Sequence, residues 1–193
     1  IQRTKWGYRR VDFDYYNGFD KERKNLALVV RPLYWVRFEC LHKWFEKFSF
    51  RSLSDQRDTG SVCFCETMLG KSKYFYGFLF LENRKDYEQD YEIMKADILE
   101  HASYVFNNFQ TINDLYDYKV DSVLKGEKEF PRAGAEWIFE DLLITRIVNP
   151  GKYDKVKKLI LEHADKLRFR EHSKPNVLMY YDKIPEIMNH MET

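Results

Sequence analysis

The spacing of apolar and polar residues predicts two strands near the start of the chain. Residues 10–16 alternate between apolar and polar side chains, which is typical of a half-buried strand. Residues 26–30 form an unbroken apolar run, which predicts a strand buried on both faces. That strand is expected to end near Pro32, because proline supplies no N–H to a ladder. Asn17 and Gly18 form a turn signal between the two runs, so we expect an antiparallel pair joined by a charged loop.

From residue 35 the spacing of apolar residues changes. Aromatic residues and a leucine recur every three or four positions, with charged residues between them. This spacing predicts an amphipathic helix that begins directly after the second strand and carries much of the core. The residues on its expected apolar face are Trp35, Phe38, Leu41, Phe45 and Phe48.

The middle of the chain predicts two more strands and then the longest helix. Residues 61–67 and 74–81 have the composition of strands. Asp86 is expected to cap the long helix, with a glutamine three residues later completing a capping box. A further helix over residues 112–124 is expected to stop at Gly126. The apolar stripe expected along the long helix consists of Tyr87, Tyr91, Met94, Ile98, Ala102, Val105 and Phe109.

The last third of the chain is helical in pattern. Residues 135–148 and 153–169 have helical spacing, and the Asn-Pro-Gly sequence at 149–151 separates them. Proline and glycine break the helix and let the chain double back, which predicts an αα-hairpin. Residues 175–181 fit more than one structure. Pro185 is expected in the first turn of a short terminal helix.

These elements predict the fold class and the domain organisation. We expect an α+β protein with an antiparallel sheet of about four strands packed by helices, followed by a helical C-terminal part. Residues 1–129 are expected to form the sheet-and-helix core, and residues 130–193 a helical part packed on the same body. A chain of 193 residues is long enough to bury a sizeable core.

Composition narrows the classes of partner and the cellular compartment. A net charge of +1 gives no overall attraction to nucleic acid or membranes. No apolar stretch approaches the roughly 18 residues that a membrane-spanning helix requires, so we expect no membrane association. Cys40, Cys63 and Cys65 are an odd number without a disulfide framework, which favours a reducing cytoplasm. Aromatic residues make up 17% of the chain, and a surplus of Tyr and Trp is typical of binding surfaces.

Two acidic residues on the first strand are the candidate catalytic residues. Asp12 and Asp14 are two positions apart, so their side chains point to the same face of a strand. Paired carboxylates can hold Mg²⁺ for phosphoryl chemistry, and Glu66 is a possible third member. This pattern supports a metal-dependent hydrolase or nuclease. The alternative interpretation is a solvated, acidic strand face without catalytic function.

Other catalytic and metal-binding patterns are incomplete. Cys63 and Cys65 also share a strand face, but structural zinc sites need a second pair or suitably spaced histidines, which favours buried free cysteines. The sequence has no glycine-rich phosphate loop, no Gly-x-Ser-x-Gly elbow and no dinucleotide fingerprint. We therefore expect no metal and no cofactor, and a binding protein rather than an enzyme.

Aromatic and basic residues supply the candidate binding residues. Trp6, Tyr8 and Arg10 lie in a basic, aromatic opening segment that could contact phosphates, although such residues also keep sheet edges soluble. Tyr74 and Tyr76 lie in YFYGFLFL, which shares a Gly-Phe core with the second signature of RNA-recognition motifs. That signature wants glycine where this chain has phenylalanine. Another protein is therefore the expected partner, with nucleic acid as the less favoured one.

The runs GYRRVDFDYYNG, NLALVVRPLYW and LHKWFEKFSF resemble small bacterial α+β domains of unknown function. The resemblance covers about the first half of the chain and rests on strand order and the placement of aromatic residues. It implies a bacterial cytoplasmic protein and no activity. We expect a non-enzymatic protein-binding module of the immunity or antitoxin kind, because the sequence lacks a catalytic constellation and is rich in the Tyr, Trp and Arg of interface hot spots.

Overall fold

The chain groups into two compact units that are described separately. The computed structural model describes residues 1–19, 26–46, 54, 57, 60–65, 78–81, 87–130, 136–168 and 175–192. The sheet unit comprises Ile1–Arg37 and Gly60–Gln110, and the helical unit comprises Phe38–Thr59 and Thr111–Thr193. These units are groups of residues in mutual contact. The division into domains after residue 129 stays a prediction.

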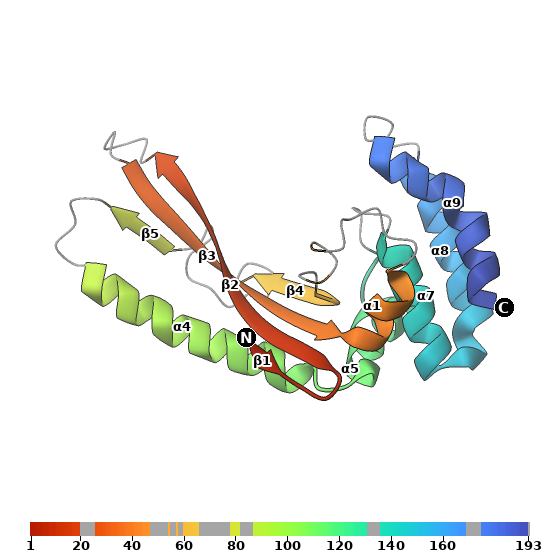
Figure 1. Ribbon diagram of the computed structural model, residues 1–193, viewed down its shortest axis with the longest axis horizontal. Coiled ribbons are helices and arrows are strands. Elements are labelled where there is room, and N and C mark those ends of the chain that lie inside the picture. The colour runs from red at the N-terminus through yellow and green to blue at the C-terminus, as the bar shows by residue number, and fades with distance from the viewer. Residues whose placement is uncertain are drawn as a thin grey trace. The chain divides into compact units, whose positions relative to one another are not determined.

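The sheet unit is built on an antiparallel sheet (Figure 1). β2 lies between β1 and β3, and β3 pairs on its other side with β4 and with β5. The three pairings whose register is defined, β1 with β2 and β3 with both β4 and β5, are antiparallel. β1 has only two residues, so the sheet has four longer strands among the described residues. The predicted antiparallel sheet of about four strands is therefore confirmed. The bounds are β1 Gln2–Arg3, β2 Gly7–Phe19, β3 Leu26–Phe38, β4 Val62–Cys65 and β5 Phe78–Leu81.

The helix predicted from residue 35 is wrong, because β3 continues through that position to Phe38. Among the described residues from 35 to 46, Glu39–Phe45 are helical, as α1. The prediction that the strand ends near Pro32 is also wrong. β3 pairs with β5 up to Val30 and with β4 from Leu33, so Pro32 lies between two ladders. A residue without an N–H is tolerated where no ladder hydrogen bond is required on that side.

The turn predicted at Asn17 and Gly18 is wrong as well. Both residues lie inside β2, which extends to Phe19. An Asn-Gly pair favours a turn only where the strands have no reason to continue, and here β2 has β3 as its neighbour in the sheet. The connection between the two strands lies outside the described residues.

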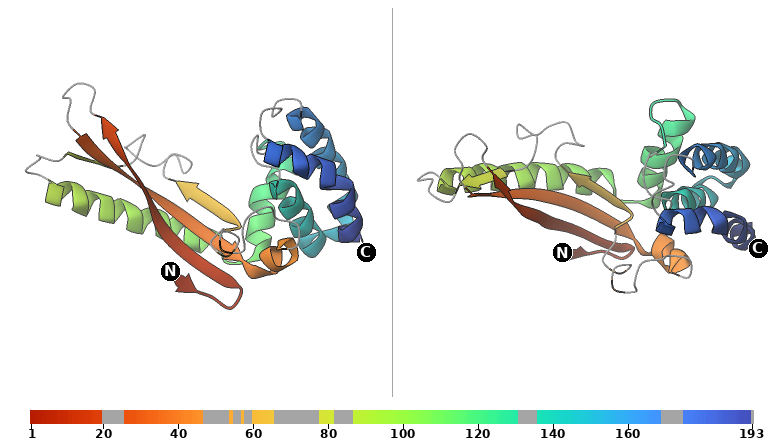
Figure 2. Two further views of the ribbon diagram at one scale, coloured as in Figure 1. Left: turned by 45° about the horizontal axis from the view of Figure 1, so that its top comes forward. Right: turned by 90° about the horizontal axis from the view of Figure 1, so that it is seen from above.

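Helix α4, Tyr87–Asn108, covers one face of the sheet (Figures 1 and 2). The Phe64 ring on β4 lies 5.1 Å from the Phe109 ring, measured between centroids. The completely buried Tyr34 of β3 lies 5.9 Å from His101 on the helix. The predicted stripe is confirmed by burial at Met94, Val105 and Phe109, but Tyr91 is 52% exposed.

The helical unit is arranged around α7, which contacts α1, α5, α8 and α9. The predicted αα-hairpin is confirmed, since α7 and α8 pack together across Asn149 and a short 3₁₀ turn. Phe139, Leu142, Ile144, Val156 and Ile160 are buried in this unit. The bounds are α5 Ile112–Tyr116, the π-helix η1 Asp117–Asp121, α6 Ser122–Leu124, α7 Glu136–Val148, η2 Pro150–Lys152, α8 Tyr153–Arg168 and α9 Pro175–Glu192.

Local sequence signals explain both ends of the predicted helix at 112–124. Thr111 caps its start, because its side chain accepts from the Asp114 N–H and the Asp114 carboxylate accepts from the Thr111 N–H. Gly126 ends it with φ of 77°. The Gly126 N–H donates to Val123 O and the next N–H to Ser122 O, which together form a Schellman motif. The predicted stop at Gly126 is confirmed.

The terminal helix differs from its prediction. α9 begins at Pro175 and continues through Pro185, so Pro185 does not start a separate helix. An internal proline removes one i to i−4 hydrogen bond and weakens the helix. Packing compensates for that loss, because Tyr181, Ile187 and Met191 are buried on one side of α9.

Candidate functional site

The sheet face opposite α4 carries a cluster of arginines and aromatic residues. Side chains alternate along a strand, so Trp35 points away from the α4 side, where Tyr34 is buried. The Arg10 guanidinium lies 5.4 Å from the Tyr8 ring centroid and 5.8 Å from the Trp35 ring centroid. Both distances are within the range of a cation–π interaction. This cluster, completed by Asp12 and Arg37, is called the arginine–aromatic face.

Two further contacts fix the arginines. Arg10 Nε lies 2.7 Å from Asp12 Oδ2, and the Arg10 side chain is 13% exposed. The Arg37 guanidinium lies 5.8 Å from the Tyr8 ring centroid and is buried. Each charged group therefore meets an aromatic ring or an opposite charge, which holds these long side chains in defined positions.

Gly60 packs closely against the Trp35 ring. An added Cβ at Gly60 would lie 2.7 Å from Trp35 Cε3 and 3.2 Å from the carbonyl oxygens of Val36 and Val62. The two backbone oxygens restrict movement of this position, so an added Cβ would require the Trp35 ring to shift. Only glycine therefore fits here while Trp35 keeps its place on the face.

The predicted binding residues do not all lie on the arginine–aromatic face. Tyr8 and Arg10 lie on the arginine–aromatic face, whereas Trp6 contacts Arg9, whose guanidinium also lies over Phe106 of α4. Tyr74 and Tyr76 lie outside the described residues. The structure adds Trp35 and Arg37, which sequence reasoning assigned to the wrong element. The spacing of Trp35 and Phe38 indicated a helix, and no local signal identified the strand.

The candidate catalytic residues are placed only in part. Asp12 forms the ion pair with Arg10, so its carboxylate already faces a cation. The backbone of Asp14 lies in β2, but its side chain and all of Glu66 lie outside the part of the chain that the structure describes. Within that part, no group of three His, Cys, Asp or Glu residues is arranged to hold a metal ion. Cys40 and Cys63 are free thiols.

The helical unit contains a second cluster of charges that sequence reasoning missed. Lys119 in the π-helix η1 reaches α7, where its Nζ lies 2.9 Å from Glu140 Oε2 and 3.3 Å from Asp141 Oδ1. Burial alone would lower the pKa of Lys119, but the Asp141 and Glu140 carboxylates outweigh it and raise that pKa. Burial raises the pKa of Asp141 to about 6, although Lys119 opposes the shift. The cluster thus holds a charged lysine against a carboxyl that is hard to ionise.

Comparison with known proteins assigns no family or function to this chain. No protein-family model, curated protein or solved structure matches this chain. Across the described residues, no helix combines the length and the apolar character needed to cross a membrane.

Proposed function

We propose that this protein is a non-enzymatic protein-binding module and that the arginine–aromatic face is its contact surface. The observation that carries the proposal is that the Arg10 guanidinium lies within cation–π distance of both the Tyr8 and the Trp35 ring and forms an ion pair with Asp12. Trp, Tyr and Arg are the residues enriched at interface hot spots. Side chains that are already held in place lose less conformational entropy on binding, which favours affinity.

The proposed partner is another protein of the bacterial cytoplasm, as for an immunity or antitoxin protein. Free thiols at Cys40 and Cys63 fit a reducing compartment. The competing function is a metal-dependent hydrolase that uses Asp12 and Asp14. The ion pair of Asp12 with Arg10 favours the binding protein, because a carboxylate held by a cation attracts Mg²⁺ less strongly.

The test begins with affinity co-purification of the tagged full-length protein from its native host, read by mass spectrometry against a tag-only control. The recovered partner is then purified and its affinity measured for variants of the face. Arg3 is exposed and pairs with Tyr8 across β1 and β2, so it lies on the same face. Arg3→Glu changes the face without disturbing the core. The matched control is Lys95→Glu on the exposed side of α4.

We expect Arg3→Glu and Arg10→Ala to weaken the complex by about tenfold or more, as for hot-spot charges. Lys95→Glu is expected to leave the affinity within about twofold. Equal affinities for all three variants would place the contact surface elsewhere. The catalytic function would replace the proposed one if the purified protein stayed monomeric, captured no partner and hydrolysed a substrate, and if Asp12→Ala abolished that hydrolysis.

A further inference from the structure

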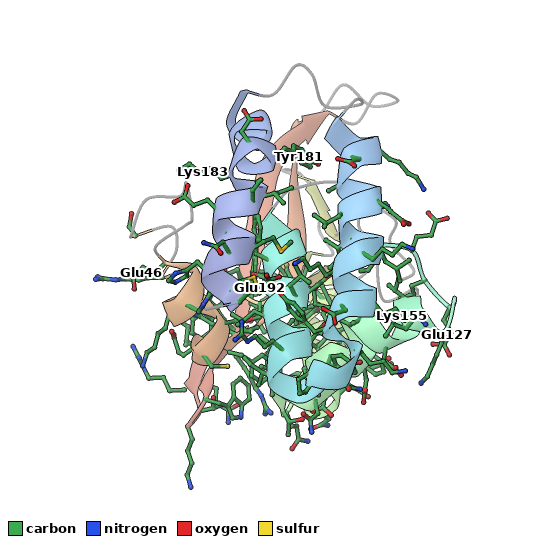
Figure 3. All side chains as sticks on the ribbon, turned by 90° about the vertical axis from the view of Figure 1, so that its right-hand side faces the viewer. Glu46, Glu127, Lys155, Tyr181, Lys183 and Glu192 are labelled. Atoms are coloured by element: carbon green, nitrogen blue, oxygen red, sulfur yellow. The ribbon has the colours of Figure 1, made fainter. Side chains whose placement is uncertain are left out.

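An open pocket lies in the helical unit where the end of α7, the start of α8 and the last turn of α9 meet. Its volume of about 410 Å³ is within the size range of small-molecule sites. Glu192 borders it from the C-terminal end of α9 (Figure 3). The pocket shares no residue with the arginine–aromatic face. Its lining consists of Arg146, Pro150, Tyr153, Asp154, Lys157 and Glu192.

The Tyr153 hydroxyl is a donor without an acceptor. Its oxygen is buried and has no hydrogen-bond partner among the described residues. Burial raises the pKa of Tyr153, the Glu192 carboxylate raises it further, and Lys157 opposes the shift. The charges that act on this hydroxyl therefore come from side chains that line the pocket. A buried hydroxyl without a partner is unfavourable, so a ligand oxygen that accepts from it would be stabilised.

Two cations complete the set of donors. Arg146 is exposed and, within the described part of the chain, makes no hydrogen bond or ion pair. Its planar guanidinium suits a carboxylate or a phosphate, which it can bind through two parallel hydrogen bonds. Lys157 is already engaged, because its Nζ donates to Glu192 Oε1. Lys157 thus holds a carboxylate that comes from the chain itself.

We propose that this pocket binds a small oxyanion, a phosphate or carboxylate group of a soluble ligand, and that Glu192 competes with that ligand for Lys157. Arg146 and Lys157 balance Asp154 and Glu192, so the formal charge of the pocket lining is zero. When Glu192 leaves Lys157, the remaining side chains carry a net positive charge. An anion that displaces Glu192 finds two cations and the Tyr153 hydroxyl as donors.

The probe is inorganic phosphate, titrated into the isotope-labelled full-length chain at constant ionic strength and followed by NMR chemical shifts. We expect saturable shifts at residues of the pocket. Glu192→Gln is expected to tighten phosphate binding about twofold to fivefold, because it removes a partly exposed competing ion pair. Lys157→Met is expected to weaken it about tenfold or more, through loss of a charge-assisted hydrogen bond.

Control variants separate the pocket from general charge effects. Glu186→Gln on α9 and Lys158→Met on α8 change exposed side chains outside the pocket and are expected to leave phosphate affinity unchanged. Tyr153→Phe keeps the ring and removes only the hydroxyl, so it tests the donor without opening the core. It is expected to weaken phosphate binding about threefold to tenfold.

Two results would overturn the proposal. The first is the same affinity in all variants, which would mean an adventitious ion only. The second is no saturable shift in either the wild type or Glu192→Gln. A parallel titration with acetate identifies the ligand class, because acetate binding with the same pattern of variants supports a carboxylate ligand. If phosphate binds and acetate does not, the result supports a tetrahedral ligand group such as a phosphate.

Discussion

Lys119 Nζ lies 3.3 Å from Asp141 Oδ1, and the Asp141 side chain is completely buried. The two residues are brought together from the π-helix η1 and from α7. Taking charges out of water is unfavourable, and a buried pair regains that free energy only when its geometry and its hydrogen bonds are complete. Here Asp141 Oδ2 has no hydrogen-bond partner among the described residues. The cluster therefore contributes more to holding η1 against α7 than to the free energy of unfolding.

Removing the lysine is expected to destabilise the protein strongly. Lys119→Met leaves Asp141 buried without a cation, which costs about 3 to 5 kcal/mol of unfolding free energy at pH 8. The loss is expected to be smaller at pH 5, where the Asp141 carboxyl can take up a proton. Urea denaturation followed by tryptophan fluorescence at both pH values measures the difference. Lys125→Met removes an exposed ion pair with Asp121 and serves as the control, with no expected change in midpoint.

The raised pKa of Asp141 predicts how stability depends on pH. A carboxyl with a pKa of about 6 in the folded state, against 3.8 as the ordinary value, binds its proton more tightly when folded. The stability from this group is fully present below pH about 4 and is lost as pH rises through about 6. The total is roughly 3 kcal/mol for a shift of this size.

Asp141→Asn tests this dependence because it cannot ionise. Its unfolding free energy is expected to lack the decline between pH 4 and 6 that the wild type shows. Asp165→Asn, an exposed acid on α8, is the matched control and is expected to follow the wild type. Parallel curves for the wild type and Asp141→Asn would show that Asp141 ionises in the folded protein as readily as in the unfolded chain.

The contact between Gly60 and Trp35 predicts a stability difference between two glycines. Gly60→Ala places a methyl group 2.7 Å from Trp35 Cε3, with backbone oxygens on either side, and is expected to cost about 1 to 3 kcal/mol of unfolding free energy. Gly151→Ala meets only Asn149 Oδ1 at 3.8 Å, which is an ordinary contact. Thermal denaturation should therefore separate the two variants. A Gly60→Ala protein as stable as Gly151→Ala would contradict the packing described for Trp35.

Sequence reasoning succeeded where the signal was local. The regular spacing in α4 and the Asn-Pro-Gly break between α7 and α8 depend on neighbouring residues, and both elements were predicted. It failed at β3, because Trp35 and Phe38 have helical spacing, whereas β3 continues to Phe38 and Trp35 pairs with Cys63 of β4. Propensity is a weak guide where tertiary pairing decides.

The residues of the candidate site also divide into those that a local signal identified and those that only tertiary contacts bring together. Tyr8 and Arg10 stood out by residue type, but Trp35 joined them only when β3 and β2 lay side by side. Lys119 and Asp141 have no local pattern that connects them. Their contact depends on how η1 packs against α7, which no spacing within either segment expresses.

The π-helix η1 changes the phase of the segment that carries Lys119. On a regular α-helix, Leu115 and Val120 would lie about 140° apart around the axis, yet both are completely buried. A turn closed by an i to i+5 hydrogen bond absorbs one additional residue and realigns the two side chains. A helical wheel drawn with a constant angle therefore divides one core-facing stripe into two. Any comparison of this segment with a related helix needs a one-residue gap at this turn.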